Sequence, residues 1–211
     1  MELRDAIRSR HMRRSFSTEA LEPALIDSLL DLARRAPSAG NTQAVGFVVL
    51  DRPDLVARYW DTTLPAEGGL GRRNRFRWPG LLDAPALILV TTDSQRYLSR
   101  YSEDDKAKTG RGQSLDRWPV PYWWVDAGSV IQNLLLLVSE ANLGACLFGP
   151  FDHEAALVRE FGLDQGRRIV ATIAIGYPLH DDEPGRSANR PRPQLTDVVI
   201  RPPARDGSEQ H

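Results

Sequence analysis

Four short runs of apolar residues recur along this chain, and they decide its fold class. Residues 45–50 and 86–90 are apolar throughout and include several β-branched side chains. A strand with one face in water alternates polar and apolar residues, so uninterrupted runs are typical of strands that are covered on both faces. Residues 145–148 and 169–175 predict a third and a fourth strand.

Between the predicted strands, apolar residues recur at intervals of three and four, which is the spacing of a helix with one buried face. A short amphipathic helix is expected over residues 3–9. A second begins at Pro23 and stops before Pro37, because proline suits the first turn of a helix and disfavours helix in the residue before it. Pro53 opens a third helix that extends to about Trp60.

The most apolar helical segment is expected to lie at the centre of the core. It has Asp126 as N-cap and ends at Gly144, and Leu136 and Leu137 widen its apolar stripe. Residues 152–162 predict a last helix. The order of elements is that of an α/β or α+β protein with more helix than strand.

The length of 211 residues, 41% of them apolar, suits one sizeable core and leaves little room for a second. We therefore expect a single domain over residues 1–200 and a flexible tail over residues 201–211. Residues 62–80 are rich in Gly and Arg and predict a long loop. Residues 93–124 are mostly polar and predict a second long loop, an insert of the kind that is usually a lid, a binding loop or a disordered segment, and a lid is expected here.

Charge and cysteine content exclude several classes of partner. The 27 basic and 28 acidic residues nearly cancel, so the net field gives no reason to expect nucleic acid or an anionic membrane as partner. The N-terminus resembles neither a signal peptide nor a lipidation motif, which favours a cytoplasmic protein. The single cysteine, Cys146, lies in an apolar run and is expected to fill the core.

Several common catalytic arrangements are missing from the sequence. No Gly-x-Gly-x-x-Gly follows a predicted strand, and there is neither a phosphate-binding Walker loop nor a nucleophile elbow. The four histidines lack the spacing of a metal site, so no metal is expected. Hydrolase, zinc-enzyme and Rossmann-type dehydrogenase functions are therefore disfavoured.

Two groups of arginines remain as candidate anion ligands. Arg10, Arg13 and Arg14 cluster near the N-terminus, and Arg190 and Arg192 alternate with prolines near the C-terminus. If folding brings the two groups together, their guanidinium groups form a cradle of phosphate size, because each can pair two phosphate oxygens. The alternative is that all five are solvated surface arginines.

Three blocks of sequence, in order, resemble the nitroreductase superfamily of FMN enzymes. The first is Arg10-His11-Met12-Arg13-Arg14-Ser15-Phe16, and the second and most specific is residues 35–43, Arg-Ala-Pro-Ser-Ala-Gly-Asn-Thr-Gln. The third comprises Asp126-Ala127-Gly128, Gln132-Asn133-Leu134 and Gly144, then residues 149–152 and 175–178. Order and spacing hold from about residue 3 to residue 200, nearly the whole chain.

The resemblance implies a fold and a cofactor. It implies an α+β, three-layer protein with a mixed, mostly antiparallel sheet flanked by helices, a domain-exchanged homodimer, and FMN at the subunit interface. The residues that match the family's cofactor-binding positions are Arg10, His11, Met12, Arg14, Pro37, Ser38, Ala39, Asn41, Gln43, Phe148, Gly149, Pro150, Arg190 and Arg192.

Within this set, the resemblance implies different roles. Arg10 and Arg14 bind the flavin phosphate or ribityl chain, and Arg190 and Arg192 also reach the phosphate. The loop of residues 37–43 approaches the flavin from the partner subunit, and a backbone N–H near Gly149 faces the flavin N5.

The sequence also departs from the family pattern. Met12 stands where a serine is usual, so one hydroxyl contact to the flavin is missing, and Pro150 has no N–H to donate. The asparagine that often binds the flavin pyrimidine is absent from its usual place, where Arg77 or Asn74 is a candidate substitute.

The activity that the resemblance implies needs no catalytic acid, base or nucleophile from the protein, since the flavin carries the chemistry. It is a ping-pong cycle in which NAD(P)H reduces FMN and the flavin then reduces a nitroaromatic, a quinone or another small conjugated acceptor. Trp123 and Trp124 either stack on that substrate or are ordinary core and interface aromatics. The alternatives are a biosynthetic flavin oxidase or dehydrogenase and a flavin-binding protein without catalysis.

Overall fold

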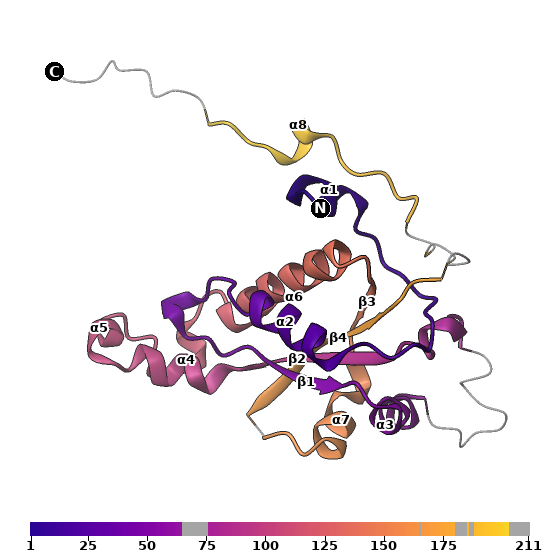
Figure 1. The fold of residues 1–211 in the computed structure, drawn as a ribbon. Helices are drawn as coiled ribbons and strands as arrows, with labels where there is room; N and C mark the ends of the chain where they lie inside the picture. The colour runs from indigo at the N-terminus through magenta and orange to yellow at the C-terminus, as the bar shows by residue number, and fades with distance from the viewer. Residues whose placement is uncertain (65–75, 165, 180–184, 186–187, 203–211) are drawn as a thin grey trace.

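A four-stranded antiparallel sheet forms the middle layer of the protein, with helices on both faces (Figure 1). The computed structural model describes residues 1–64, 76–164, 166–179, 185 and 188–202. The strands are β1 (Gly46–Leu50), β2 (Ala86–Asp93), β3 (Gly144–Phe148) and β4 (Arg167–Gly176), in the order β1-β2-β4-β3. The four predicted strands are confirmed, and so is the three-layer α+β architecture.

The helices within the described residues fall into long segments and single turns. The α-helices are α1 (Leu3–Ser9), α2 (Pro23–Ala33), α3 (Pro53–Thr63), α4 (Ser94–Tyr101), α5 (Asp104–Ala107), α6 (Tyr122–Glu140), α7 (Glu154–Glu160) and α8 (Leu195–Val198). The 3₁₀ turns are η1 (Ala39–Asn41), η2 (Pro79–Leu81), η3 (Leu115–Arg117) and η4 (Phe151–His153).

One face of the sheet packs on α2 and α6. Alternate residues of β2, such as Ile88 and Val90, meet Leu134 of α6 and Leu30 of α2 in the main core. Seven side chains of α6 are buried, so the prediction that this helix is the central one is confirmed. Burial of such side chains contributes about 1.5–3 kcal/mol each to the stability of the fold.

The opposite face packs on α3 and α7 and carries the other residues of the same strands. Leu87 and Leu89 of β2 and Cys146 of β3 lie here beside Tyr59 and Trp60 of α3. Cys146 is buried and fills the core as expected. The pairing of β2 with β4 shifts between Val90 and Thr91, which marks a β-bulge. Residues two apart in a regular strand share a face, but because of the bulge Ile169 packs on this face and Ala171 on the other.

Three details differ from the sequence-based predictions. β1 lies at the edge of the sheet and, although its side chains contact the cores on both faces as its apolar run predicted, all but Leu50 are only partly buried. Residues 93–124, expected to form a loop, contain α4, α5 and η3, because aromatic side chains such as Tyr97 and Trp118 pack inward. Helix α6 begins at Tyr122, so Asp126 is a buried residue within the helix and the N-cap prediction is wrong.

Some predictions fall on residues outside those described. They are most of the loop of residues 62–80, including Asn74, and nearly all of the tail of residues 201–211. In the described chain, no helix combines the length and the apolar character that a membrane span requires.

Candidate functional site

The N-terminal arginine motif is attached to the free edge of β3. Met12 forms a parallel bridge with Ala145, and the Arg13 N–H donates a hydrogen bond to the Ala145 carbonyl over 2.8 Å. The Leu147 N–H lies 3.3 Å from the Met12 sulfur, which takes the place of a backbone acceptor. Residues 10–14 therefore extend the sheet by one short segment, and their side chains are fixed relative to β3.

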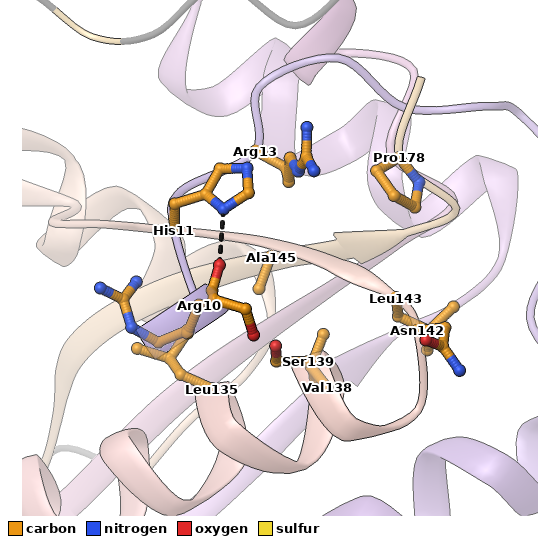
Figure 2. A pocket seen from close by; sticks show the side chains of 11 residues that line it. Arg10, His11, Arg13, Leu135, Val138, Ser139, Asn142, Leu143, Ala145 and Pro178 are labelled. Carbon is orange, nitrogen blue, oxygen red and sulfur yellow. Dashed lines mark hydrogen bonds between the residues drawn. The ribbon is translucent and has the colours of Figure 1, made fainter. Parts of the chain in front are cut away.

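A cavity of about 230 Å³ lies at the beginning of this segment, between the segment and α6 (Figure 2). Arg10, His11 and Arg13 line one side, and Ser139 and other residues of α6 face them. Its remaining lining residues are Ser9, Leu135, Val138, Asn142, Leu143, Ala145 and Pro178.

Arg10, which lines this cavity, also has an unsatisfied donor in its guanidinium. Its Nη1 atom is buried and has no hydrogen-bond partner within the described chain. A buried guanidinium N–H without an acceptor is unfavourable, and a bound anion removes the penalty. This atom therefore fits a phosphate group, whose oxygens are strong acceptors.

His11 is oriented by a local hydrogen bond. Its Nδ1 lies 2.7 Å from the Ser9 carbonyl oxygen, as the dashed line in Figure 2 shows. A carbonyl oxygen can only accept, so Nδ1 carries a proton in this arrangement. The Nε2 atom remains available as a second polar contact at the rim of the cavity.

A second cavity, of about 390 Å³, lies at the other end of the segment. Arg14 and the turn Phe148-Gly149-Pro150 form one side of it. Its other lining residues are largely aromatic and come mostly from α3 and from residues 76–81: Tyr59, Trp60, Thr63, Leu64, Phe76, Trp78 and Leu81, together with Cys146, Leu147 and His153. The cavity suits a flat, apolar group with a polar edge.

Aromatic contacts give this second cavity a rigid wall. The rings of Trp60 and Phe148 are stacked, with centroids 5.9 Å apart, and Phe76 lies 6.0 Å from Trp60. The Trp60 Nε1 atom is buried without a hydrogen-bond partner in the part of the chain that the structure describes. The wall thus offers stacking surface, and it contains one buried donor without a partner among the described residues.

Arg14 and Arg77 both contact Trp78. Their guanidinium carbons lie 4.9 Å and 4.6 Å from the centroid of the Trp78 ring. Stacking on an aromatic ring holds a guanidinium in place, and Arg14 Nη1 also donates to the Met12 carbonyl over 3.4 Å. The expectation that Arg77 lies near the site therefore has a geometric basis, since Trp78 lines the aromatic cavity.

The loop of residues 37–43 lines neither of these two cavities. It is internally bonded: the Gln43 N–H donates to Ser38 Oγ over 3.0 Å, and Gln43 Nε2 donates to Asn41 Oδ1 over 2.9 Å. One chain alone does not bring Pro37, Ser38 and their neighbours to Arg10.

The remaining predicted residues lie apart from the two cavities. Arg190 and Arg192 are exposed on the segment that runs away from the sheet in Figure 1, and within the described chain neither has a polar partner. Trp123 packs against Tyr97 and Trp118, while the Trp124 ring lies 5.5 Å from the guanidinium of Arg168. Neither tryptophan lines either of the two cavities in a single chain.

Sequence reasoning did not single out several residues that line the two cavities. Tyr59, Trp60 and Phe76 belong to segments that were interpreted only as helix or loop. The signal that could have identified Trp60 is a large aromatic with a polar N–H in a short amphipathic helix. Among the described residues, no group of three or more His, Cys, Asp or Glu is placed to hold a metal.

Comparison with known proteins agrees with this architecture. Residues 7–177 match the model of the Nitroreductase family. The 4-nitrobenzoate reductase of Nocardioides sp. (strain LMS-CY) is 30% identical over 193 residues, which cover 81% of this chain and 78% of that protein. The CLA biosynthesis enone reductase of Lactiplantibacillus plantarum is 26% identical over 203 residues, covering 85% of this chain and 88% of the other.

Solved structures show the same fold at low sequence identity. A nitroreductase-like protein from Streptococcus mutans gives a TM-score of 0.74 at 16% identity, covering 94% of this chain and 97% of its own. A nitroreductase-like family protein from Bacillus cereus gives 0.71 at 19% identity and covers 97% of both chains.

The wall of the aromatic cavity yields a prediction about pH. Burial raises the pKa of Tyr59 to about 12, and the Tyr59 hydroxyl lies 2.9 Å from Thr172 Oγ1. In the unfolded chain the Tyr59 hydroxyl loses its proton near pH 10, whereas in the folded protein it keeps the proton to about pH 12. The folded state is therefore fully stabilised relative to the unfolded state below pH 10, and this contribution is lost as pH rises to about 12. Over that window the free energy of unfolding of the wild type falls by up to about 1.4 kcal/mol per pH unit more than that of Tyr59→Phe.

Urea denaturation at a series of pH values measures this difference. Tyr122→Phe, on an exposed ring, is the control and is expected to follow the wild type. Parallel pH curves for the wild type and Tyr59→Phe would contradict the prediction.

Proposed function

The chain belongs to the nitroreductase family and is an oxidoreductase, and we propose that it is an FMN-dependent enzyme that uses NAD(P)H to reduce small conjugated acceptors. The observation that carries the proposal is Arg10, which lines a cavity at the edge of β3 and has a buried guanidinium Nη1 without a partner among the described residues. A second, aromatic cavity lies at the far end of the same short segment, on the α3 side of the sheet, and we propose that it adds a flat apolar end to the site.

The polar end would hold the phosphate of FMN. Arg10 supplies a charged donor that has no partner within the described protein, and His11 and Arg13 line the same cavity. Arg190 and Arg192 carry two further guanidinium groups, and we propose that they complete the phosphate site in the assembled protein. This would explain why an extended, proline-bounded segment presents both of them to solvent in one chain.

The aromatic end would hold the ring system. Trp60, Phe148 and Phe76 provide a stacking wall, and Arg14 is held in place by the face of Trp78. When bound, the flavin accepts hydride from NAD(P)H and passes the electrons to the acceptor. The Arg14 charge would favour the anionic reduced ring, and the apolar wall would exclude water from it.

The acceptor class is proposed from chemistry and from the relatives' names. One relative is named for the reduction of 4-nitrobenzoate and another for the reduction of an enone. Both names describe flat, conjugated, electron-poor molecules, which suit a site with an aromatic wall and arginine at its edge. We propose nitroaromatics, quinones and enones as acceptors, used in a ping-pong cycle.

A homodimer is proposed as the working form, because two regions of the chain need a partner. Leu195, Val198 and Ile200 are exposed on a segment that leaves the body of the fold (Figure 1). Exposed apolar residues also lie on α1, where Leu3 and Ile7 are exposed and Leu3 lines a groove against α6. Burying both regions against a second copy would remove this apolar surface from water and bring the loop of residues 37–43 to a neighbouring site.

The first test is an absorbance spectrum of the purified protein. We expect flavin bands between roughly 350 and 500 nm, loss of colour on anaerobic addition of NADH or NADPH, and return of colour with a nitroaromatic, a quinone or an enone. Protein that stays colourless after incubation with FMN would contradict the proposal. Bound FMN that neither nicotinamide reduces would instead support the oxidase or non-catalytic alternatives.

The phosphate site is tested by Arg10→Gln. Removing this charged donor is expected to raise the FMN dissociation constant about 10- to 100-fold, the scale of one hydrogen bond between charged groups. Riboflavin, which lacks the phosphate, should bind both proteins equally, and flavin fluorescence titration measures both ligands. Arg8→Gln, on an exposed arginine of α1, is the matched control. Equal losses for FMN and riboflavin would contradict a phosphate role.

The dimer is tested by placing charge on the C-terminal segment. Val198 and Ile200 are exposed in one chain and would be buried in the proposed dimer. Replacing both (Val198→Asp with Ile200→Asp) is expected to raise the dimer dissociation constant at least about tenfold, because the apolar contribution to association is lost. Analytical ultracentrifugation measures it, and flavin content should fall in parallel. Thr196→Asp, an exposed polar position of α8, is the control. A wild type that is monomeric while binding FMN would overturn the dimer proposal.

A further inference from the structure

The loop of residues 38–43 has a backbone that its own sequence does not favour. Gly40, Asn41 and Gln43 all have positive φ, at 62°, 54° and 50°. Glycine adopts the left-handed conformation freely and asparagine more readily than most residues, whereas it is unfavourable for Gln43. Such a conformation persists where surrounding contacts fix it.

A buried carboxylate fixes the first part of the loop. Asp126 of α6 is only 5% exposed, and its Oδ2 accepts hydrogen bonds from the Ala39 N–H over 2.8 Å and from the Tyr97 hydroxyl over 2.7 Å. No ion pair of Asp126 occurs in the described part of the chain, so these neutral donors stabilise its charge. Loss of either donor would leave the buried carboxylate under-solvated.

An arginine of the neighbouring helix fixes the second part. Arg100 Nε of α4 donates to the Gly40 carbonyl over 2.8 Å. The same guanidinium is itself held by both oxygens of Asp105, at 2.6 Å and 2.8 Å, and by Glu103 at 3.0 Å. Because Arg100 is bound to a carboxylate on its other side, it is oriented toward the loop and cannot easily turn away.

Packing closes the arrangement. A Cβ added to Gly40 would lie 2.8 Å from Cε2 of the Tyr101 ring, so any side chain at that position would require the Tyr101 ring to move. The Tyr101 ring is in turn packed on Trp118, with centroids 4.6 Å apart. The loop is therefore held by two polar contacts and by one close aromatic contact.

We infer that Asp126, Tyr97 and Arg100 are positioning residues that hold the loop of residues 38–43 in its flavin-facing shape. The insert of residues 93–124 then acts as a brace for this loop, with α4 supplying two of the three side chains. The inference rests on the proposed function in one respect only, namely that the loop faces a bound flavin. The bracing contacts themselves are made within one chain.

The test compares Tyr97→Phe and Arg100→Gln with the wild type in two measurements. The first is hydrogen–deuterium exchange of peptides that cover residues 38–43, made on the flavin-free full-length protein. Each variant removes one contact to the loop or to Asp126, and exchange in this region should accelerate about tenfold or more, the scale of one hydrogen bond to a charged group. The second is the FMN dissociation constant, which should rise by a similar factor.

Matched controls separate bracing from general damage. Tyr122→Phe removes a hydroxyl from an exposed ring of the same aromatic cluster, and Arg96→Gln removes a guanidinium from the same helix α4. Both are expected to leave exchange of residues 38–43 and FMN binding unchanged. Arg100→Lys keeps the charge but loses the Nε contact, so it should behave like Arg100→Gln rather than restore the wild-type values.

The outcomes separate the brace from the function. Faster exchange together with weaker FMN binding supports the inference. Unchanged exchange in both variants overturns it, whatever the flavin does. Faster exchange with unchanged FMN affinity overturns the positioning role toward the flavin. If the wild type binds no FMN at all, the proposed function fails, and faster exchange in the flavin-free variants would then establish the brace alone.

Discussion

The attachment of residues 10–14 to the edge of β3 is the interaction on which the candidate site depends. A main-chain hydrogen bond from Arg13 and a contact to the sulfur of Met12 fix this segment beside Ala145 and Leu147. Arg10 is thereby placed at one cavity and Arg14 at the other. Met12, which departs from the family's usual serine, has a structural role here, since its sulfur accepts from the strand that supports the site.

Two parts of the molecule support this edge from different sides. The central helix α6 packs on the sheet, contributes the far wall of the polar cavity, and carries Asp126 about two and a half turns before Leu135, the first residue of that wall. The insert of residues 93–124 contributes no side chain to either cavity but holds the loop that would face a partner's site. A site shared between two subunits needs both a rigid edge and a rigid loop, because groups that already have their bound conformation lose less entropy when the subunits associate.

Much of the fold could be predicted from the sequence because hydrophobic periodicity reports it directly. Four apolar runs gave the strands, and prolines 23 and 53 marked helix starts at the observed positions. Burial of β1 was overestimated, because the composition of one strand does not tell whether that strand lies at the centre or at the edge of the sheet. The helices of residues 93–124 and the role of Asp126 could not be seen, because they depend on tertiary contacts between Tyr97, Asp126 and Ala39. The arginine motif was found by its pattern, whereas Trp60 and Phe76 became candidates only through the cavity they share.

A crystal structure of the full-length protein grown with FMN tests the central claim most directly, because it locates the phosphate relative to Arg10. The account predicts a dimer in which a phosphate oxygen lies within hydrogen-bond distance of Arg10 Nη1 and the ring lies at the Phe148-Gly149-Pro150 turn. A flavin whose phosphate lies away from the segment of residues 10–14, with Arg10 Nη1 still lacking an acceptor, would contradict it.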